Sequence, residues 1–126
     1  MTPEEKAAAY TAAWNSKDAA RVAGHFAPEA SIVINRGDPH KGRTALEAMA
    51  AGFHAEFPDL HLTCDGIRAG GDHMIYLWTL EGHHAETGNH CKVGGWEEWD
   101  LGPDMQVLAS KGWFDADDYQ RQVDGG

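Results

Sequence analysis

The chain has 126 residues, 42% of them apolar, so we expect one packed globular domain spanning residues 1–126. Its formal net charge is -10, which argues against nucleic acid and anionic membranes as partners because both attract a basic surface. The charged N-terminus precedes no long apolar run, so we expect neither a signal peptide nor a spanning helix, and a cytoplasmic location.

The first half of the chain predicts helices around one strand. Thr2 is a natural N-cap, Pro3 suits the first helical position and Glu5 completes a capping box, which predicts a helix to about Asn15. A short second helix carries Val22, His25 and Phe26 and ends before Pro28. Further along, the pattern predicts a strand over 30–35, a loop over 36–42 and a third helix over about 44–57.

The second half predicts a meander of strands. These cover about 60–68, 73–84, 90–101 and 105–114, with turn residues between them and a short final helix capped by Asp115. Helices followed by an antiparallel meander indicate an α+β fold with helices on one face of the sheet.

The cysteines and histidines do not form a metal-binding pattern. Cys64 and Cys91 are the only cysteines, and two isolated thiols suggest small buried residues in a reducing compartment. The dense set His83, His84, Glu86, His90 and Cys91 lacks the spacing of a structural zinc site. We therefore expect no metal and no cofactor.

Two glutamates between two tryptophans, in the stretch 95–101, are the main candidates for chemistry. Alternation along a strand sends Glu97 and Trp99 to one face and Trp96 and Glu98 to the other. A carboxylate held against apolar surface has a raised pKa, which suits proton transfer near neutral pH. The residues alone leave open which of the two faces is buried.

Several segments in order resemble the NTF2-like superfamily, in its SnoaL-like polyketide cyclase and ketosteroid isomerase-related branch. The segments are 10–18, 25–33, 41–43, 57–60, 78–85 and 113–122. The resemblance implies a strongly curved antiparallel sheet wrapped around three N-terminal helices into a cone, with a short C-terminal helix. It also implies an apolar pocket at the mouth of the cone and an outer sheet face that commonly forms a dimer.

The resemblance also implies which positions carry chemistry. The tyrosine oxyanion donor of the isomerases falls on Tyr10 and their second acid on Glu97. Their aspartate base falls on Ile34, beside Asn35, and the catalytic aspartate of the cyclases falls on or near Gly112. Two of the acids known from this superfamily are therefore missing.

On this basis we predict a pocket for a flat, mostly apolar molecule. The predicted catalytic residues are Glu97, Tyr10, Asn35, Glu81 and His83, the last two forming an acid–imidazole pair on one strand face. The predicted substrate-binding residues are Trp14, Phe53, Phe57, Thr79, Trp99 and Ser110.

Two functions remain open. The first is a cofactor-independent isomerase or cyclase that acts on a cyclic or polyketide-like carbonyl compound by proton transfer. The second is a non-catalytic ligand-binding or dimerisation module that has lost the acids. A stripe of Tyr76, Trp78 and Leu80 with Trp96 is expected on the outer face, where it would form a homodimer.

Overall fold

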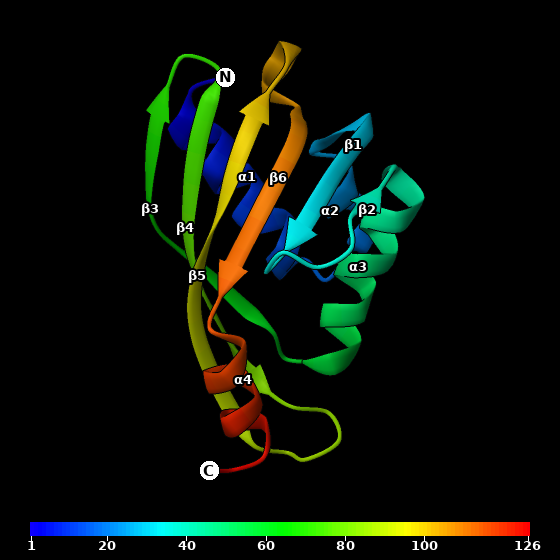
Figure 1. Cartoon of the computed structure of the whole chain (residues 1–126), viewed down its shortest axis with the longest axis vertical. Coiled ribbons are helices and arrows are strands. Elements are labelled where there is room, and N and C mark those ends of the chain that lie inside the picture. The colour runs from blue at the N-terminus through cyan, green and yellow to red at the C-terminus, as the bar shows by residue number, and fades with distance from the viewer.

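The computed structural model describes all residues 1–126 and contains four α-helices and six strands (Figure 1). The helices are α1 (Pro3–Asn15), α2 (Ala19–Ala23), α3 (Arg43–Glu56) and α4 (Ala116–Val123). The strands are β1 (Phe26–Ile34), β2 (His40–Lys41), β3 (His61–Gly70), β4 (His73–His83), β5 (His90–Leu101) and β6 (Val107–Phe114). A 3-10 turn, Pro103–Met105, precedes β6. None of the helices is long and apolar enough to cross a membrane.

The six strands form one curved sheet in the order β2-β1-β6-β5-β4-β3. Strands β3 to β6 form the expected antiparallel meander, and β6 then pairs in parallel with β1. Helices α1 and α2 lie behind the sheet and α3 flanks it beside β1, while α4 covers the far end of β5 (Figure 1). This is the predicted α+β cone.

Both predicted helix caps form. Thr2 Oγ1 accepts a hydrogen bond from Glu5 N at 3.1 Å, and Glu5 Oε1 accepts one from Thr2 N at 2.8 Å. Asp115 Oδ1 accepts from Asp118 N at 3.0 Å at the start of α4. These bonds satisfy amide groups that have no partner within the helix.

The prediction of the second helix was too long. Helix α2 ends at Ala23, and Phe26 already belongs to β1. Pro28 lies inside that strand, where the pairing with β6 shifts register between Phe26 and Ser31. Such an irregularity accommodates proline because no regular ladder bond from its nitrogen is required.

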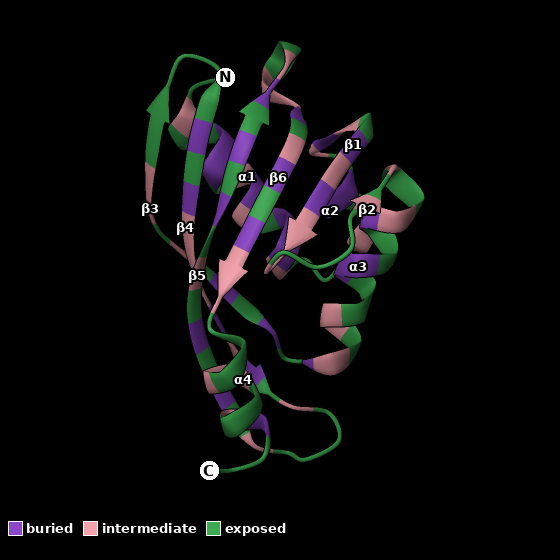
Figure 2. Cartoon of the chain, in the orientation of Figure 1, coloured by how far each residue is buried: buried purple, intermediate pink, exposed green.

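The core lies between the inner sheet face and the helices, where buried residues alternate along the strands (Figure 2). On β5 the inward residues include Val93, Glu97, Trp99 and Leu101. Alternation predicted that the last three share a face, and the family resemblance placed that face toward the pocket. Trp96 on the opposite face is 40% exposed.

The predicted orientation of β4 was wrong. Tyr76 pairs with Glu97 across the sheet and is fully buried, and Leu80 is also buried. Tyr76, Trp78 and Leu80 therefore face inward rather than forming an outer stripe. Alternation along the strand explains this orientation, because it puts the apolar residues on the core side and the polar residues Thr79, Glu81 and His83 on the opposite side.

Candidate active site

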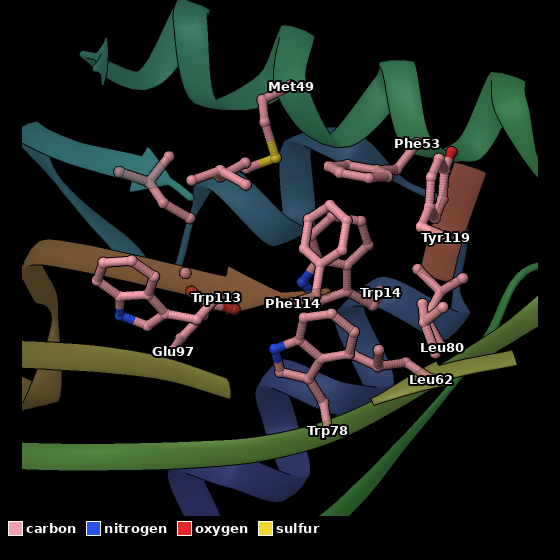
Figure 3. Close-up of a pocket in the computed structure, with 14 residues that line it drawn as sticks. Trp14, Met49, Phe53, Leu62, Trp78, Leu80, Glu97, Trp113, Phe114 and Tyr119 are labelled. Atoms are coloured by element: carbon pink, nitrogen blue, oxygen red, sulfur yellow. The ribbon is translucent and has the colours of Figure 1, made fainter. Parts of the chain in front are cut away.

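A pocket opens between the inner sheet face and helices α1, α3 and α4 (Figure 3). Its walls enclose about 620 Å3 when the open mouth is counted, and 12 of its 14 lining residues are hydrophobic. The lining residues are Trp14, Ile32, Ile34, Met49, Phe53, Leu62, Trp78, Leu80, Val93, Glu97, Gly112, Trp113, Phe114 and Tyr119. An apolar, largely aromatic lining of this kind suits a small ligand of low polarity.

Glu97 is the one ionisable acid among these lining residues, and it is only 7% exposed. Three side chains donate hydrogen bonds to its carboxyl group. Tyr10 Oη donates to Oε2 at 2.8 Å, while Ser110 Oγ and Trp99 Nε1 donate to Oε1 at 2.9 and 3.0 Å. Each carboxylate oxygen can accept two hydrogen bonds, so these three donors leave one acceptor position free on Oε2.

The register of the sheet places Glu97 at the wall of the pocket. Ile34 on β1 pairs with Gly112 on β6, and Gly112 pairs with Glu97 on β5, so the three residues form a row across the sheet. Gly112 has no side chain, and a Cβ there would lie 3.9 Å from Glu97 Cγ. The absence of a side chain at Gly112 therefore leaves space beside the Glu97 carboxyl group.

Burial raises the pKa of Glu97, and the three hydrogen bonds together with the positive charge of Lys6 oppose that rise. Tyr10 has its own pKa raised well above the ordinary value, mainly by burial, so it remains a donor at all physiological pH values. A carboxyl group whose pKa is raised toward neutrality can both take and return a proton.

Lys6 is a buried cation close to this carboxyl group, with only 2% of the residue exposed. Its Nζ donates to His25 Nδ1 at 2.9 Å and to the His25 carbonyl oxygen at 3.0 Å, and it lies 5.8 Å from the centre of the Trp99 ring. Burial lowers the Lys6 pKa to about 8 and the His25 pKa to about 4. His25 is therefore neutral near pH 7, and its Nδ1 accepts the bond from Lys6.

The structure gathers five more of the predicted residues around Glu97 or on the pocket wall. Ser110 and Trp99 donate hydrogen bonds to the Glu97 carboxyl group, whereas Trp14 and Phe53 line the pocket itself. Tyr10 is fully buried and its hydroxyl is already engaged by Glu97, so it supports the acid rather than the pocket wall.

Phe57 and Asn35 lie elsewhere. Phe57 packs edge-on against His84 and Tyr119 and does not line the pocket. Asn35 Oδ1 accepts a hydrogen bond from Phe114 N at 2.9 Å, which ties the end of β1 to the end of β6. The Asn35 oxygen thus stabilises the sheet and Asn35 does not line the pocket, so its role in orienting a substrate stays a prediction.

The predicted pocket residues of β4, namely Thr79, Glu81 and His83, do not face the pocket. Thr79 Oγ1 donates to Asp65 Oδ2 at 2.6 Å. Glu81 Oε2 bonds His90 Nε2 at 2.7 Å. His83 Nδ1 bonds Asp59 Oδ2 at 2.6 Å, so the expected Glu81–His83 pair does not form. The reason is the reversed orientation of β4 described above.

No group of three or more histidine, cysteine or acidic residues is arranged to hold a metal ion. The histidines near the β4–β5 connection instead contact separate acids: His84 with Glu56, His83 with Asp59 and His90 with Glu81.

Lys6 was missed by the sequence analysis. It stands four residues before Tyr10, which places both on one side of α1. A lysine on the apolar stripe of a helix was the signal that could have drawn attention to it, because buried lysines are rare unless they have partners.

The fold and the pocket define an NTF2-like domain, and comparison with known proteins agrees. The family model described as "SnoaL-like domain" matches residues 7–107, so the chain belongs to the SnoaL-like family. A search of curated proteins gives no match.

Solved structures share the fold at low sequence identity. A protein of ketosteroid isomerase-like fold from Catenulispora acidiphila, in complex with trimethylamine, has a TM-score of 0.87 at 19% identity, covering 98% of this chain and 95% of that chain. A candidate SnoaL-like polyketide cyclase from Jannaschia sp. CCS1 has a TM-score of 0.82 at 15% identity, covering 100% and 97%. The epoxide hydrolase/cyclase-like enzyme SalBIII, linked to pyran ring formation in salinomycin, has a TM-score of 0.80 at 17% identity, covering 91% and 92%.

Proposed function

We propose that this protein is a cofactor-independent isomerase or cyclase that acts on a cyclic or polyketide-like carbonyl compound by proton transfer. The observation that carries the proposal is the Glu97 carboxyl group, which is buried, has a raised pKa and opens onto an apolar pocket. A carboxylate in such surroundings is a stronger base than one in water, because the charged form is less stabilised by solvent.

In the proposed reaction, Glu97 Oε2 takes a proton from the carbon next to the substrate carbonyl. The C–H electron pair forms a C=C bond, and the carbonyl π electrons move to oxygen to give an enolate. Where the substrate carries a C=C bond conjugated with the enolate, the electrons shift along it, and return of the proton to the far carbon of that bond completes an isomerisation. Attack of the enolate carbon on a second carbonyl completes an aldol cyclisation instead, and the new alkoxide takes up the proton.

Tyr10, Ser110 and Trp99 act as positioning residues in this proposal. They hold the carboxyl group in one orientation and stabilise its charge, and none of their three donor groups is free for the substrate. This revises the role expected for Tyr10, which by resemblance would donate directly to the enolate.

The names of two structural relatives, a candidate polyketide cyclase and an epoxide hydrolase/cyclase-like enzyme, support carbonyl or cyclisation chemistry as the class of reaction. A specific observation favours the alternative, a non-catalytic ligand-binding module. Ile34 and Gly112 occupy the row beside Glu97, so no second carboxyl group is available there to share the proton transfer.

We also propose a homodimer that forms through the outer face of the sheet. Ile75, Trp96 and Leu108 are large apolar side chains that are 37%, 40% and 46% exposed. Leu77 pairs with Trp96 across β4 and β5. Exposed apolar side chains gathered on a sheet suit contact with a second copy.

The test of the catalytic proposal is exchange of the α-hydrogens of 1-tetralone, a small bicyclic ketone, in D2O, followed by NMR. Glu97→Gln keeps the shape of the side chain but removes the base, so the protein-catalysed rate should fall by about 100-fold or more. Glu98→Gln changes the exposed neighbour on the opposite face and serves as the control. Equal rates for all three proteins would contradict the proposal and favour the binding module.

A further inference from the structure

We propose that the indole N–H of Trp78 is the hydrogen-bond donor that receives the substrate's carbonyl oxygen beside Glu97. This inference rests on the proposed function and specifies it further, because it assigns the oxygen-binding group and requires a substrate oxygen next to the reacting carbon.

Trp78 brings an unengaged donor to the wall of the pocket. The residue is half-buried and lines the pocket, and its Nε1 makes no hydrogen bond within the protein. The buried nitrogen atoms that lack a partner and are closed even to water are Trp14 Nε1 and His54 Nδ1, and Trp78 Nε1 is not among them. An oxygen atom in the pocket can therefore reach this N–H. In a lining that is otherwise apolar, one accessible donor is enough to orient a ligand.

Three of the five indole N–H groups are already engaged by glutamates. Trp96 and Trp113 donate to Glu98 on the outer face of the sheet, and Trp99 donates to Glu97. These three donors are therefore not available to a ligand in the pocket.

The N–H of Trp14 is not available either. It is closed to any atom of the size of a water molecule, and it lies beside the Tyr10 hydroxyl, whose pKa it lowers. The hydroxyl groups of Tyr10 and Ser110 both donate to Glu97. Near Glu97, the Trp78 N–H is thus the side-chain donor that a ligand oxygen can reach.

The ring of Trp78 lies across Gly95 of β5. The two residues pair in the sheet, and a Cβ at Gly95 would lie 2.6 Å from Trp78 Cζ2 and 2.8 Å from Cη2. Because Cζ2 is two bonds from Nε1, the edge of the indole that bears the nitrogen is the edge that covers β5. The missing side chain at Gly95 therefore gives this donor its place on the sheet.

This place is next to the proposed base. Glu97 follows Gly95 by two residues on the same face of β5, which corresponds to about 7 Å along the strand. Figure 3 shows the indole nitrogen of Trp78 on the side of its ring toward Glu97, away from Leu62 and Leu80. The carbonyl oxygen and the α-carbon of a ketone are two bonds apart. A substrate that presents its α-hydrogen to Glu97 can therefore direct its oxygen to Trp78.

The arrangement fits enolate formation. As Glu97 takes the proton from carbon, negative charge develops on the carbonyl oxygen, and Trp78 donates a hydrogen bond to that oxygen while it keeps its own proton. A donor fixed in an apolar surrounding stabilises the developing charge better than it stabilises the neutral ketone. The same donor distinguishes a ketone from a hydrocarbon of equal shape, because the hydrocarbon covers the N–H without offering it an acceptor.

Tyr119 offers a matched control within the same pocket. Its hydroxyl also makes no hydrogen bond within the protein, and Figure 3 shows it beside Phe53, on the opposite side of the pocket from Glu97. Tyr119→Phe removes this hydroxyl and keeps the ring that packs against Phe57 and Phe114. Both variants thus delete one unengaged polar group from the lining, but only Trp78→Phe deletes the one near the base.

The experiment compares 1-tetralone with tetralin, which has the same bicyclic skeleton without the oxygen. Dissociation constants for both compounds are measured by calorimetry on wild type, Trp78→Phe and Tyr119→Phe, and circular dichroism establishes that each variant is folded. In parallel, 15N-labelled wild type reports the five indole N–H signals, which are assigned through their own backbone resonances.

We expect the ratio of the tetralin constant to the tetralone constant to fall about tenfold in Trp78→Phe and to stay within about twofold in Tyr119→Phe. The comparison of two ligands of one shape cancels the loss of ring contacts that Trp78→Phe also causes. The Trp78 indole proton should resonate further downfield in the tetralone complex than in the tetralin complex, whereas the other indole protons should agree between the two complexes.

An unchanged ratio in Trp78→Phe, or a Trp78 signal that is the same in both complexes, overturns the inference even where Glu97-dependent exchange is observed. An equal fall of the ratio in Tyr119→Phe overturns it as well. If Trp78→Phe does not fold, the indole shift in wild type decides. Failure of wild type to bind either compound overturns the inference and the proposed pocket together. Binding with the Trp78 shift but without exchange supports the inference and rejects only the catalytic proposal.

Discussion

Removal of the Tyr10 hydroxyl tests whether this residue supports Glu97 or contacts the substrate. Tyr10→Phe keeps the buried ring, which packs edge-on against Trp99 and Tyr76, and deletes only the group that donates to Glu97 Oε2. The structure therefore predicts a change in the ionisation of Glu97 itself.

The magnitude follows from the hydrogen bond that is lost. A hydrogen bond to a charged group contributes roughly 1.5–3 kcal/mol, and one pKa unit corresponds to about 1.36 kcal/mol. Because the bond favours the ionised carboxylate, its loss should raise the Glu97 pKa further, by about 1 to 2 pH units.

The assay is a titration of the Glu97 side-chain carboxyl carbon by 13C NMR, assigned with Glu97→Gln. Tyr76→Phe is the matched control, since Tyr76 also lies beside Glu97 but its hydroxyl bonds Thr11. A Glu97 pKa that is the same in Tyr10→Phe, Tyr76→Phe and wild type would refute the reasoning. Loss of turnover in Tyr10→Phe without any change of this pKa would instead indicate a direct role in catalysis.

Three further variants test other parts of the account. Lys6→Met removes a charge that lowers the Glu97 pKa, so the pH midpoint of exchange should move upward; a downward or absent change would contradict this. The Lys6 pKa falls from 10.5 to about 8 on folding, so between these pH values the unfolded chain binds more protons than the folded chain. The stability of wild type relative to Lys6→Met should therefore increase as the pH rises from about 8 to 10.5, as measured by chemical denaturation at each pH. Gly95→Ala would press a Cβ against the Trp113 carbonyl oxygen and place it 2.6 Å from the Trp78 ring, so it should lower the free energy of unfolding by roughly 1–3 kcal/mol. Gly94→Ala, with its nearest atom at 3.7 Å, should change that free energy little in the same urea titration. Trp96→Glu should convert the proposed dimer to a monomer in size-exclusion chromatography, and a variant that remains dimeric would rule out this face.

The sequence was most informative where the side-chain pattern was strong. The capping box at Thr2, the helix over Pro3–Asn15 and the alternation along β5 follow from local rules, and the structure confirms them. Glu97 faces inward because Trp99 and Leu101 share its side of the strand and both need burial. Its catalytic role stays a prediction.

The error at β4 could have been avoided from the sequence. Alternation along 73–83 puts Met74, Tyr76 and Leu80 on one apolar face and leaves His73, Glu81 and His83 on the other. The other failure concerns a relation between segments. The role of Lys6 depends on His25 and Trp99, which reach it from other elements.

The most direct test of the central claim compares two values measured on wild-type protein. One is the pKa of the Glu97 carboxyl from the 13C titration, and the other is the pH midpoint of 1-tetralone exchange. The account predicts that the two coincide and lie above the ordinary glutamate value of 4.5. A midpoint that differs from the Glu97 pKa, or a Glu97 pKa at or below 4.5, would contradict the claim that this buried carboxyl group transfers the proton.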